Sequence, residues 1–375
     1  MLQMIYFMSY MKSMLIRSFL VSLIPVVLVG CGTDDDAPIV AMPIPVSGFE
    51  AMSAEIRAGQ LGRIEAVVVD QSGSVVYETY FRDSNAGSRI DVRSVGKSLT
   101  ALAIGAAVED GLLESVDVPV WDYLIGEEPV EHDGPAKREI TVDDLLSMSS
   151  TLDCSDWVSR SPGNEERMYR TDVWRDFALN LPVDPDYREL PNGYGRFSYC
   201  TAGVFLLGQV VEKATGQRFD SYVQARLFDP LGIAGADWRR SPSGEIQSGG
   251  QLGVRPADLA RVGRMVLNGG TFDGQRILSA DWLRTMLTPK VGATADMDYG
   301  YLWWTRFFAA PNGTRTGGAF MSGNGGNIVV LLPDYDAVAV VAATSYNRDD
   351  AFDNAITVIE THVIPELAKR TGSAS

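Results

Sequence analysis

Runs of β-branched and aromatic residues stand near both ends of the chain, and turn-forming residues bound each run. Near the start, residues 64–70 and 74–80 are separated by a short segment containing Gly73, which predicts a β-hairpin. Three later runs predict further strands, at 299–305, 327–332 and 337–343. We therefore expect strands from the two ends of the chain to share one sheet.

Helical spacing of apolar positions dominates the middle of the chain. The run that starts at Ser94 closes near Gly111, and Thr141 with Asp144 forms a capping box before a short helix. The other predicted helices cover 201–215, 219–228, 256–267 and about 350–369. Because helices lie between the terminal strands, we expect an α+β fold with an antiparallel sheet from both chain ends, flanked by helices.

This pattern also predicts how the folded part is divided. The folded region would cover 49–372, with a sheet part at about 49–110 and 250–372. A mostly helical insertion would occupy about 111–249. A small-molecule cleft is expected between the two layers.

The first residues have the features of a secretory signal. Residues 1–31 carry two positive charges, then an apolar run, and end in Leu28-Val29-Gly30-Cys31. This ending is similar to a bacterial lipobox, so we expect a lipoprotein anchored through Cys31 on the periplasmic side of a membrane, followed by a flexible tether over 32–48. The alternative is an ordinary signal peptide with an incidental cysteine. No later apolar run is long enough for a membrane span.

The net charge of the chain limits the classes of molecule that it could bind. A formal net charge of −16 argues against nucleic acid or anionic lipid surfaces as partners. We expect a small-molecule substrate, and the oligomeric state is open.

Besides Cys31 the chain has Cys154 and Cys200. A disulfide between them would close a loop of about 46 residues and stabilise the fold by about 4 kcal/mol. Two unrelated buried thiols remain the alternative.

Ser94 and Lys97 are the first candidates for chemistry. Residues three apart on a helix lie on one face, so the lysine amine can reach the serine hydroxyl, as in Ser-Lys acyl-transfer enzymes. The helix start would also direct the backbone N–H of Ser94 at a developing oxyanion. The spacing alone is weak evidence, because Ser9 and Lys12 repeat it within the predicted signal.

Other hydrolase mechanisms have less support. The two histidines, His132 and His362, have no second ligand at metal spacing, and no Gly-x-Ser-x-Gly motif occurs. We therefore expect neither metal nor cofactor. Tyr199, just ahead of a predicted amphipathic helix, could relay a proton to a leaving group, but by itself it could equally be a packing aromatic.

Several motifs together resemble the penicillin-recognising serine hydrolases, specifically the class C β-lactamase-related branch with its β-lactamase/transpeptidase-like fold. Ser94-Val95-Gly96-Lys97 is similar to the first family motif, and Phe197-Ser198-Tyr199-Cys200-Thr201 to the tyrosine motif. Further similar segments, in the same order, are 140–150, 206–208, 229–232 and 256–261. The Ser-Gly-Asn-Gly-Gly stretch at 322–326 resembles the 6-aminohexanoate-dimer hydrolase and esterase members.

The resemblance implies roles for individual residues. Ser94 would be the nucleophile, Lys97 its base and Tyr199 the proton relay, and Asn324 would contribute a second oxyanion N–H. The resemblance also places a small group of residues at the substrate, namely Thr201, Ser322, Gly323 and Asn324.

Two positions depart from the family pattern. Met321 replaces a basic residue, and Thr201 replaces an asparagine. Both departures argue against β-lactam turnover and favour an ester or amide substrate. The alternatives are an acyl transferase, a cell-wall peptidase, or a silent binding protein that keeps the fold.

Overall fold

The computed structural model describes residues 47–126 and 130–372. The predicted signal peptide, the predicted lipidation site at Cys31 and nearly all of the predicted tether lie outside these residues. The described part begins with helix α2, Gly48–Arg57, which is capped by reciprocal hydrogen bonds between Ser47 and Glu50. No helix within the described ranges is both long enough and apolar enough to cross a bilayer.

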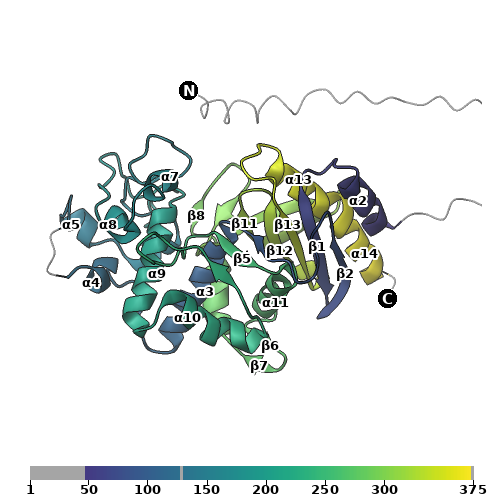
Figure 1. Cartoon of the computed structure of the whole chain (residues 1–375), viewed down its shortest axis with the longest axis horizontal. Helices are drawn as coiled ribbons and strands as arrows, with labels where there is room; N and C mark the ends of the chain where they lie inside the picture. Colours follow the sequence, from purple (N-terminus) through teal and green to yellow (C-terminus); the bar gives the residue numbers. More distant parts are fainter. Residues whose placement is uncertain (1–46, 127–129, 373–375) are drawn as a thin grey trace, which may run out of the picture. The chain divides into compact units, whose positions relative to one another are not determined.

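An eight-stranded antiparallel sheet forms one part of the molecule (Figure 1). Its strand order is β2-β1-β13-β12-β11-β10-β9-β8. The strands are β1 Ile64–Gln71, β2 Ser74–Tyr80, β8 Val291–Gly292, β9 Asp298–Tyr299, β10 Trp304–Ala309, β11 Arg315–Gly323, β12 Asn327–Leu332 and β13 Ala337–Ala343. Because β1 pairs directly with β13, as in Val68 opposite Val340, the sheet joins the two ends of the described chain. The predicted α+β fold is confirmed.

Helices cover both faces of this sheet, which explains the continuous apolar sequence of β12 and β13. Helix α11, Pro256–Leu267, packs on β1, β12 and β13. On the other face lie α2 and the C-terminal helices α13, Ala351–Thr357, and α14, Ile364–Gly372, joined by a π-helical turn (Figure 1). Strands covered on both faces bury every side chain and cannot alternate between apolar and polar residues.

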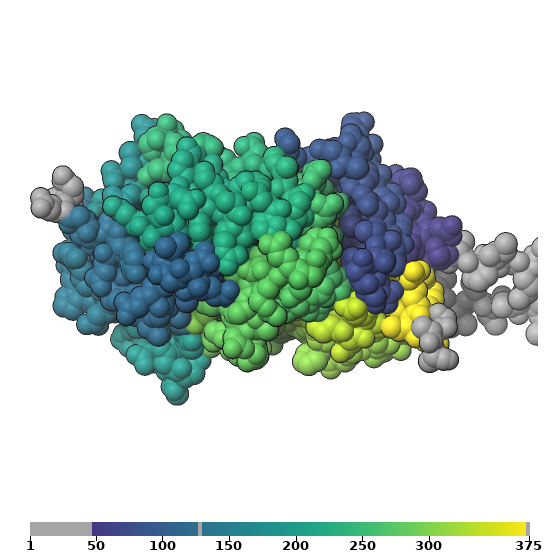
Figure 2. Space-filling model, turned by 90° about the horizontal axis from the view of Figure 1, so that it is seen from below, coloured from purple at the N-terminus to yellow at the C-terminus, as the bar shows by residue number. Residues whose placement is uncertain are grey.

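The remaining helices build a second part, between β3 and β5 in sequence. They are α3 Val95–Glu109, α4 Val120–Leu124, α5 Pro135–Arg138, α6 Val142–Leu146, α7 Glu165–Met168, α8 Trp174–Leu179, α9 Thr201–Thr215 and α10 Phe219–Val223. Helix α3 contacts both α9 and β11, and most of its residues are buried. It therefore links the helical part to the sheet. In Figure 2 the purple and yellow of the two ends of the described chain lie together at one end of the picture.

The minor elements complete the chain. A three-stranded sheet contains β3 Ile90–Asp91, β5 Leu252–Val254 and β4 Asp237–Trp238, and a hairpin contains β6 Thr271–Phe272 and β7 Gln275–Arg276. Helix α12, Ala280–Leu287, lies between this hairpin and β8. The sequence pattern did not predict α12 or the short helices α4, α5, α7 and α8.

The predicted strand over 299–305 is wrong in detail, because residues between β9 and β10 form a turn. Leu302 has a φ of 57°, and a Cβ added at Gly300 would lie 2.3 Å from the carbonyl oxygen of Met286. Both features require an irregular backbone against α12, and a period-two pattern cannot reveal such a contact.

Candidate active site

Ser94 and Lys97 face each other at the start of α3. The Lys97 Nζ lies 3.0 Å from the Ser94 Oγ. Ser94 occupies the N-cap position, but its hydroxyl does not cap the helix, so the oxygen is available to the lysine. The preceding residue, Arg93, has a φ of 54°, a left-handed conformation that turns the chain sharply into the helix. The predicted Ser-Lys pair is therefore assembled in space.

Lys97 is almost completely buried, with 1% of its surface exposed. Its Nζ donates a hydrogen bond of 2.6 Å to the carbonyl oxygen of Gly249 and lies 4.8 Å from the centre of the Tyr199 ring. The loop around Gly249 can approach the helix because Gly96 lacks a side chain; a Cβ there would lie 3.1 Å from Gly250 Cα. These contacts hold the amine in one place, directed at Ser94.

Tyr199 lies just before α9 and joins this group from the helical part. Burial raises the pKa of its phenol, while the charge of Lys97 and a hydrogen bond with Ser94 oppose that rise. The phenol is thus neutral near pH 7 and can donate a proton. Two segments about a hundred residues apart in sequence therefore place serine, lysine and tyrosine side by side.

The end of β11 runs directly against the start of α3. A Cβ at Gly323 would lie 2.0 Å from the Val92 carbonyl oxygen and 3.1 Å from the Ser94 nitrogen, so only glycine fits there. In the described part of the chain, neither the Ser94 N–H nor the Asn324 N–H donates to another group. The Ser94 N–H therefore lies at this close approach, next to the end of the strand.

The turn between β11 and β12 holds the other predicted residues. Ser322 is partly exposed, and Asn324 is exposed, its side chain bonded to Asn347 through both its oxygen and its nitrogen. Gly325 and Gly326 have positive φ values, which tighten the turn. Met321 is fully buried, so no cationic side chain stands at this point of the strand.

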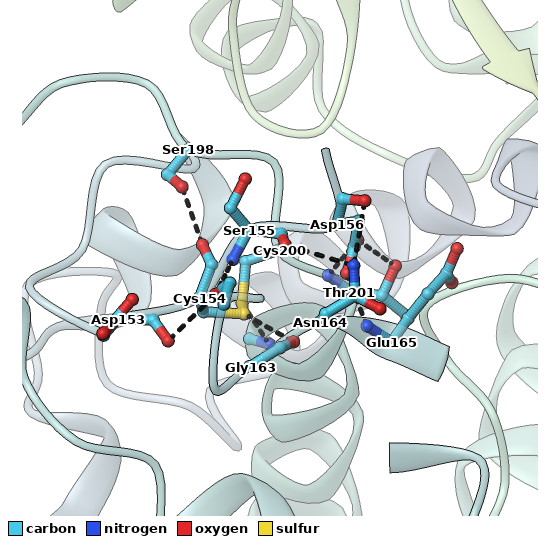
Figure 3. Close-up of a disulfide and its surroundings, with 12 residues drawn as sticks. Asp153, Cys154, Ser155, Asp156, Gly163, Asn164, Glu165, Ser198, Cys200 and Thr201 are labelled. Carbon is cyan, nitrogen blue, oxygen red and sulfur yellow. Dashed lines mark hydrogen bonds between the residues drawn. A yellow bond between two sulfur atoms is a disulfide. The ribbon is translucent and has the colours of Figure 1, made fainter. Parts of the chain in front are cut away.

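Thr201 is the predicted site residue that the structure places differently. It is fully buried, and both its N–H and its hydroxyl donate to the Asp156 carboxylate, at 2.8 and 2.7 Å (Figure 3). Both polar groups of Thr201 are therefore taken up by Asp156, and the N-cap of α9 is Cys200. The acidic partner, Asp156, is half-buried, and the sequence did not single it out because it belongs to no motif.

Asp156 has an unusual charge environment. Burial and the nearby charge of Glu165 raise its pKa to about 7, against the opposing influence of Lys97 and the Thr201 hydrogen bonds. Its other carboxylate oxygen accepts from the Glu165 N–H at 2.9 Å. A carboxylate that titrates near neutrality thus lies next to the Ser-Lys-Tyr group.

The two cysteines that the sequence left open form a disulfide (Figure 3). It joins Cys154, at the start of the loop that carries Asp156, to Cys200, the residue after Tyr199. A glycine allows the loop to close on itself, because a Cβ at Gly163 would lie 2.6 Å from the Cys154 Cβ. The disulfide therefore attaches this loop to the tyrosine segment.

Other predicted features lie away from this group. His132 is in an exposed loop, and His362 is buried against Glu55 at 3.2 Å. The described residues contain no cluster of three side chains that could hold a metal ion.

Two surface hollows lie away from the Ser-Lys-Tyr group, one beside Phe177 and one beside Trp238. Neither hollow is lined by Ser94 or Tyr199. The predicted cleft is therefore not among these hollows.

The beta-lactamase family model matches residues 59–362, which include the whole sheet, α3 and α9. The chain belongs to the beta-lactamase family. The fold predicted from the motifs is confirmed.

Individual members of the beta-lactamase family show how far the similarity extends. The chain is 30% identical over 224 residues to the 6-aminohexanoate-dimer hydrolase of Paenarthrobacter ureafaciens, covering 57% of this chain and 55% of the relative. It is 29% identical to penicillin-binding protein 4 of Amycolatopsis lactamdurans, covering 50% and 53%. The chain thus spans about half the length of these curated relatives.

A solved structure supports the fold over a longer stretch. A candidate 6-aminohexanoate-dimer hydrolase from Bacillus anthracis superposes with a TM-score of 0.66 at 18% identity, covering 82% of this chain and 81% of that one. At 18% identity, this similarity supports the beta-lactamase fold of the chain and nothing finer.

Proposed function

We propose that this protein hydrolyses an ester or amide bond of a small acyl substrate through an acyl-enzyme on Ser94. The observation that carries the proposal is the 3.0 Å approach of the Lys97 Nζ to the Ser94 Oγ, with Tyr199 beside both. A serine needs an adjacent base to act as a nucleophile, and no histidine is near enough to serve.

The proposed reaction has two halves. In the first, Ser94 Oγ attacks the carbonyl carbon and its proton passes to the Lys97 Nζ. The N–H groups of Ser94 and Asn324 stabilise the oxyanion, and Tyr199 protonates the leaving alcohol or amine as the tetrahedral intermediate collapses. In the second half, water attacks the acyl-enzyme as the Tyr199 phenolate takes its proton, and Lys97 returns its proton to Ser94 Oγ as the acid leaves. No bond change in this sequence needs a metal or a cofactor.

The surroundings favour a substrate other than a β-lactam. A buried Met321 leaves no cation on the strand beside Ser322 to hold a substrate carboxylate, and Thr201 is occupied by Asp156. Acyl transfer on the same residues is the alternative, because it differs only in the acceptor that reaches the acyl-enzyme.

The test is covalent labelling together with turnover. We expect a fluorophosphonate to add once to the protein, at Ser94, and p-nitrophenyl acetate to be hydrolysed. Ser94→Ala should abolish both while the circular dichroism spectrum is unchanged. Lys97→Met should lower turnover at least about 100-fold, since the serine loses its base.

Lys137→Met supplies the matched control. Lys137 is also fully buried, but its Nζ donates to backbone carbonyl groups in the helical part. Its loss should lower stability and leave turnover per folded molecule unchanged. Labelling or turnover that survives in Ser94→Ala would refute the proposed nucleophile.

A further inference from the structure

Trp157 is an exposed aromatic residue at the active-site group that no step of the proposed reaction uses. Half of its surface, 50%, is exposed, although most large apolar side chains of the described chain are buried. Its ring lies nearly parallel to the Tyr199 ring, with an angle of 8° and 5.8 Å between centres, and also stacks on Trp304 at 6.4 Å. The exposed part of the indole is available to a ligand.

The loop that carries Trp157 is held firmly on both sides of the indole. Cys154 is joined to Cys200 by the disulfide, and the Asp156 N–H donates to the Tyr199 carbonyl oxygen at 2.8 Å. The Asn164 side chain donates to the Asp156 carbonyl oxygen at 3.0 Å, which closes the loop from the other side (Figure 3). The indole is therefore held in position before any ligand arrives. A ligand that binds to the indole then orders little of the protein, so the loss of conformational entropy is small.

The position of the indole indicates which part of a substrate it would meet. In the proposed reaction, which this inference requires, Tyr199 protonates the leaving group. Trp157 lies against Tyr199, together with Phe197, whose ring centre is 5.5 Å away. The next residue, Val158, is 42% exposed and extends the apolar surface. The leaving group, and not the acyl group, is therefore the part next to this surface.

We propose that Trp157 is a specificity-determining residue that stacks on a flat, apolar alcohol or amine leaving group. The favoured substrates are then esters or amides of aromatic alcohols or amines. Stacking of aromatic rings and burial of the exposed indole face would together favour such a group by about 10-fold over a small aliphatic one.

The test compares two acetate esters that give the same acyl-enzyme, 2-naphthyl acetate and ethyl acetate. Trp157→Ala should lower kcat/KM for 2-naphthyl acetate about 10-fold and leave that for ethyl acetate within about twofold. Trp157→Phe should restore most of the loss, because a flat ring returns. Leu112→Ala is the matched control, since Leu112 is 42% exposed but follows the opposite end of α3 from Ser94.

A binding measurement separates this inference from the proposed reaction. Titration of 2-naphthol into Ser94→Ala should show saturable binding by calorimetry, weakened about 10-fold when Trp157→Ala is added. If neither ester is hydrolysed but this binding difference holds, the proposed reaction fails and the aromatic site stands. Equal losses for both esters, or 2-naphthol binding that is insensitive to Trp157, would overturn the inference.

Discussion

Asp156 carries the most unusual single-residue chemistry next to the Ser-Lys-Tyr group. Its carboxylate accepts three hydrogen bonds, two from Thr201 and one from the Glu165 N–H, and each of them favours the charged form. Burial and the charge of Glu165 nevertheless raise its pKa to about 7. An ordinary aspartate has a pKa of about 3.9 in an unfolded chain. The folded protein therefore binds a proton here more tightly than the unfolded chain does.

This difference predicts how stability depends on pH. The raised pKa of Asp156 means that protonation favours the folded state. The protonated Asp156 therefore contributes to stability at low pH, and this contribution is lost as pH rises from about 4 to 7. Asp156→Asn removes that dependence. We expect the free energy of unfolding of the wild type, relative to the variant, to fall by about 3 kcal/mol between pH 5 and pH 8. Urea denaturation at several pH values measures it.

Asp83→Asn is the control for this pH series. Its carboxylate is exposed, so the difference between this variant and the wild type should be the same at pH 5 and pH 8. An Asp156→Asn difference that is also independent of pH would contradict the raised pKa.

At the scale of elements, the decisive contact is between β11 and the start of α3. The strand end approaches the helix so closely that only a hydrogen atom fits at Gly323. Asn324, the next residue of the chain, therefore follows directly on the contact with the Ser94 nitrogen. A displacement of either element would move Asn324 away from the Ser94 nitrogen while the Ser94 and Lys97 side chains stayed together on one helix.

Substitution of this glycine should therefore affect activity strongly. In Gly323→Ala the new methyl group would collide with the Val92 carbonyl oxygen and push β11 away from α3. We expect kcat for p-nitrophenyl acetate to fall about 100-fold, the usual effect of losing an oxyanion donor. Fluorophosphonate labelling should slow in parallel.

Gly317→Ala is the matched control on the same strand. A Cβ at Gly317 would meet only the Phe307 ring, at an ordinary contact distance of 3.7 Å. Its kcat should stay within about twofold of the wild-type value. Wild-type kcat in Gly323→Ala would show that the close approach is not needed for catalysis.

The whole molecule is held together by contacts between distant parts of the chain. The sheet joins β1 near the start to β13 near the end, and α3 links that sheet to the helical part. Within the helical part, the Cys154–Cys200 disulfide closes a loop between residues 46 apart. Such a crosslink stabilises mainly by restricting the unfolded chain.

Loss of the disulfide should lower global stability. We expect the double variant Cys154→Ser and Cys200→Ser to lose about 4 kcal/mol in free energy of unfolding, measured by urea denaturation. A thiol reductant should destabilise the wild type and leave the variant unchanged. Equal unfolding midpoints for the two proteins without reductant would show that the crosslink contributes nothing.

Many elements follow from local sequence alone. The hairpin of β1 and β2, the capping box at Thr141 and the helix α9 with Gly216 as its left-handed C-cap appear where the pattern predicts them. Their signals lie within a few neighbouring residues. Local pattern does not predict strand β11, because its central glycines have low strand preference. Pairing with β10 and β12 holds it in the sheet.

Some residues of the candidate site could likewise be predicted from local sequence, and others depend on tertiary contacts. Ser94 and Lys97 could be paired from sequence because one helix turn joins them, and the motif resemblance added Tyr199. Asp156 and Trp157 could not be found, because they belong to a loop without a motif. Their closeness to Tyr199 depends on the disulfide and on the start of α9.

The sequence by itself therefore determined the fold class, most of the long helices and strands, and the Ser-Lys pair, because each depends on spacing within one element. The tertiary structure alone decided three other features. It buried Thr201 beneath Asp156, brought the end of β11 against the start of α3, and placed Trp157 on Tyr199. Each of these needs segments far apart in sequence to meet, and the packing of side chains, not local spacing, sets where they meet.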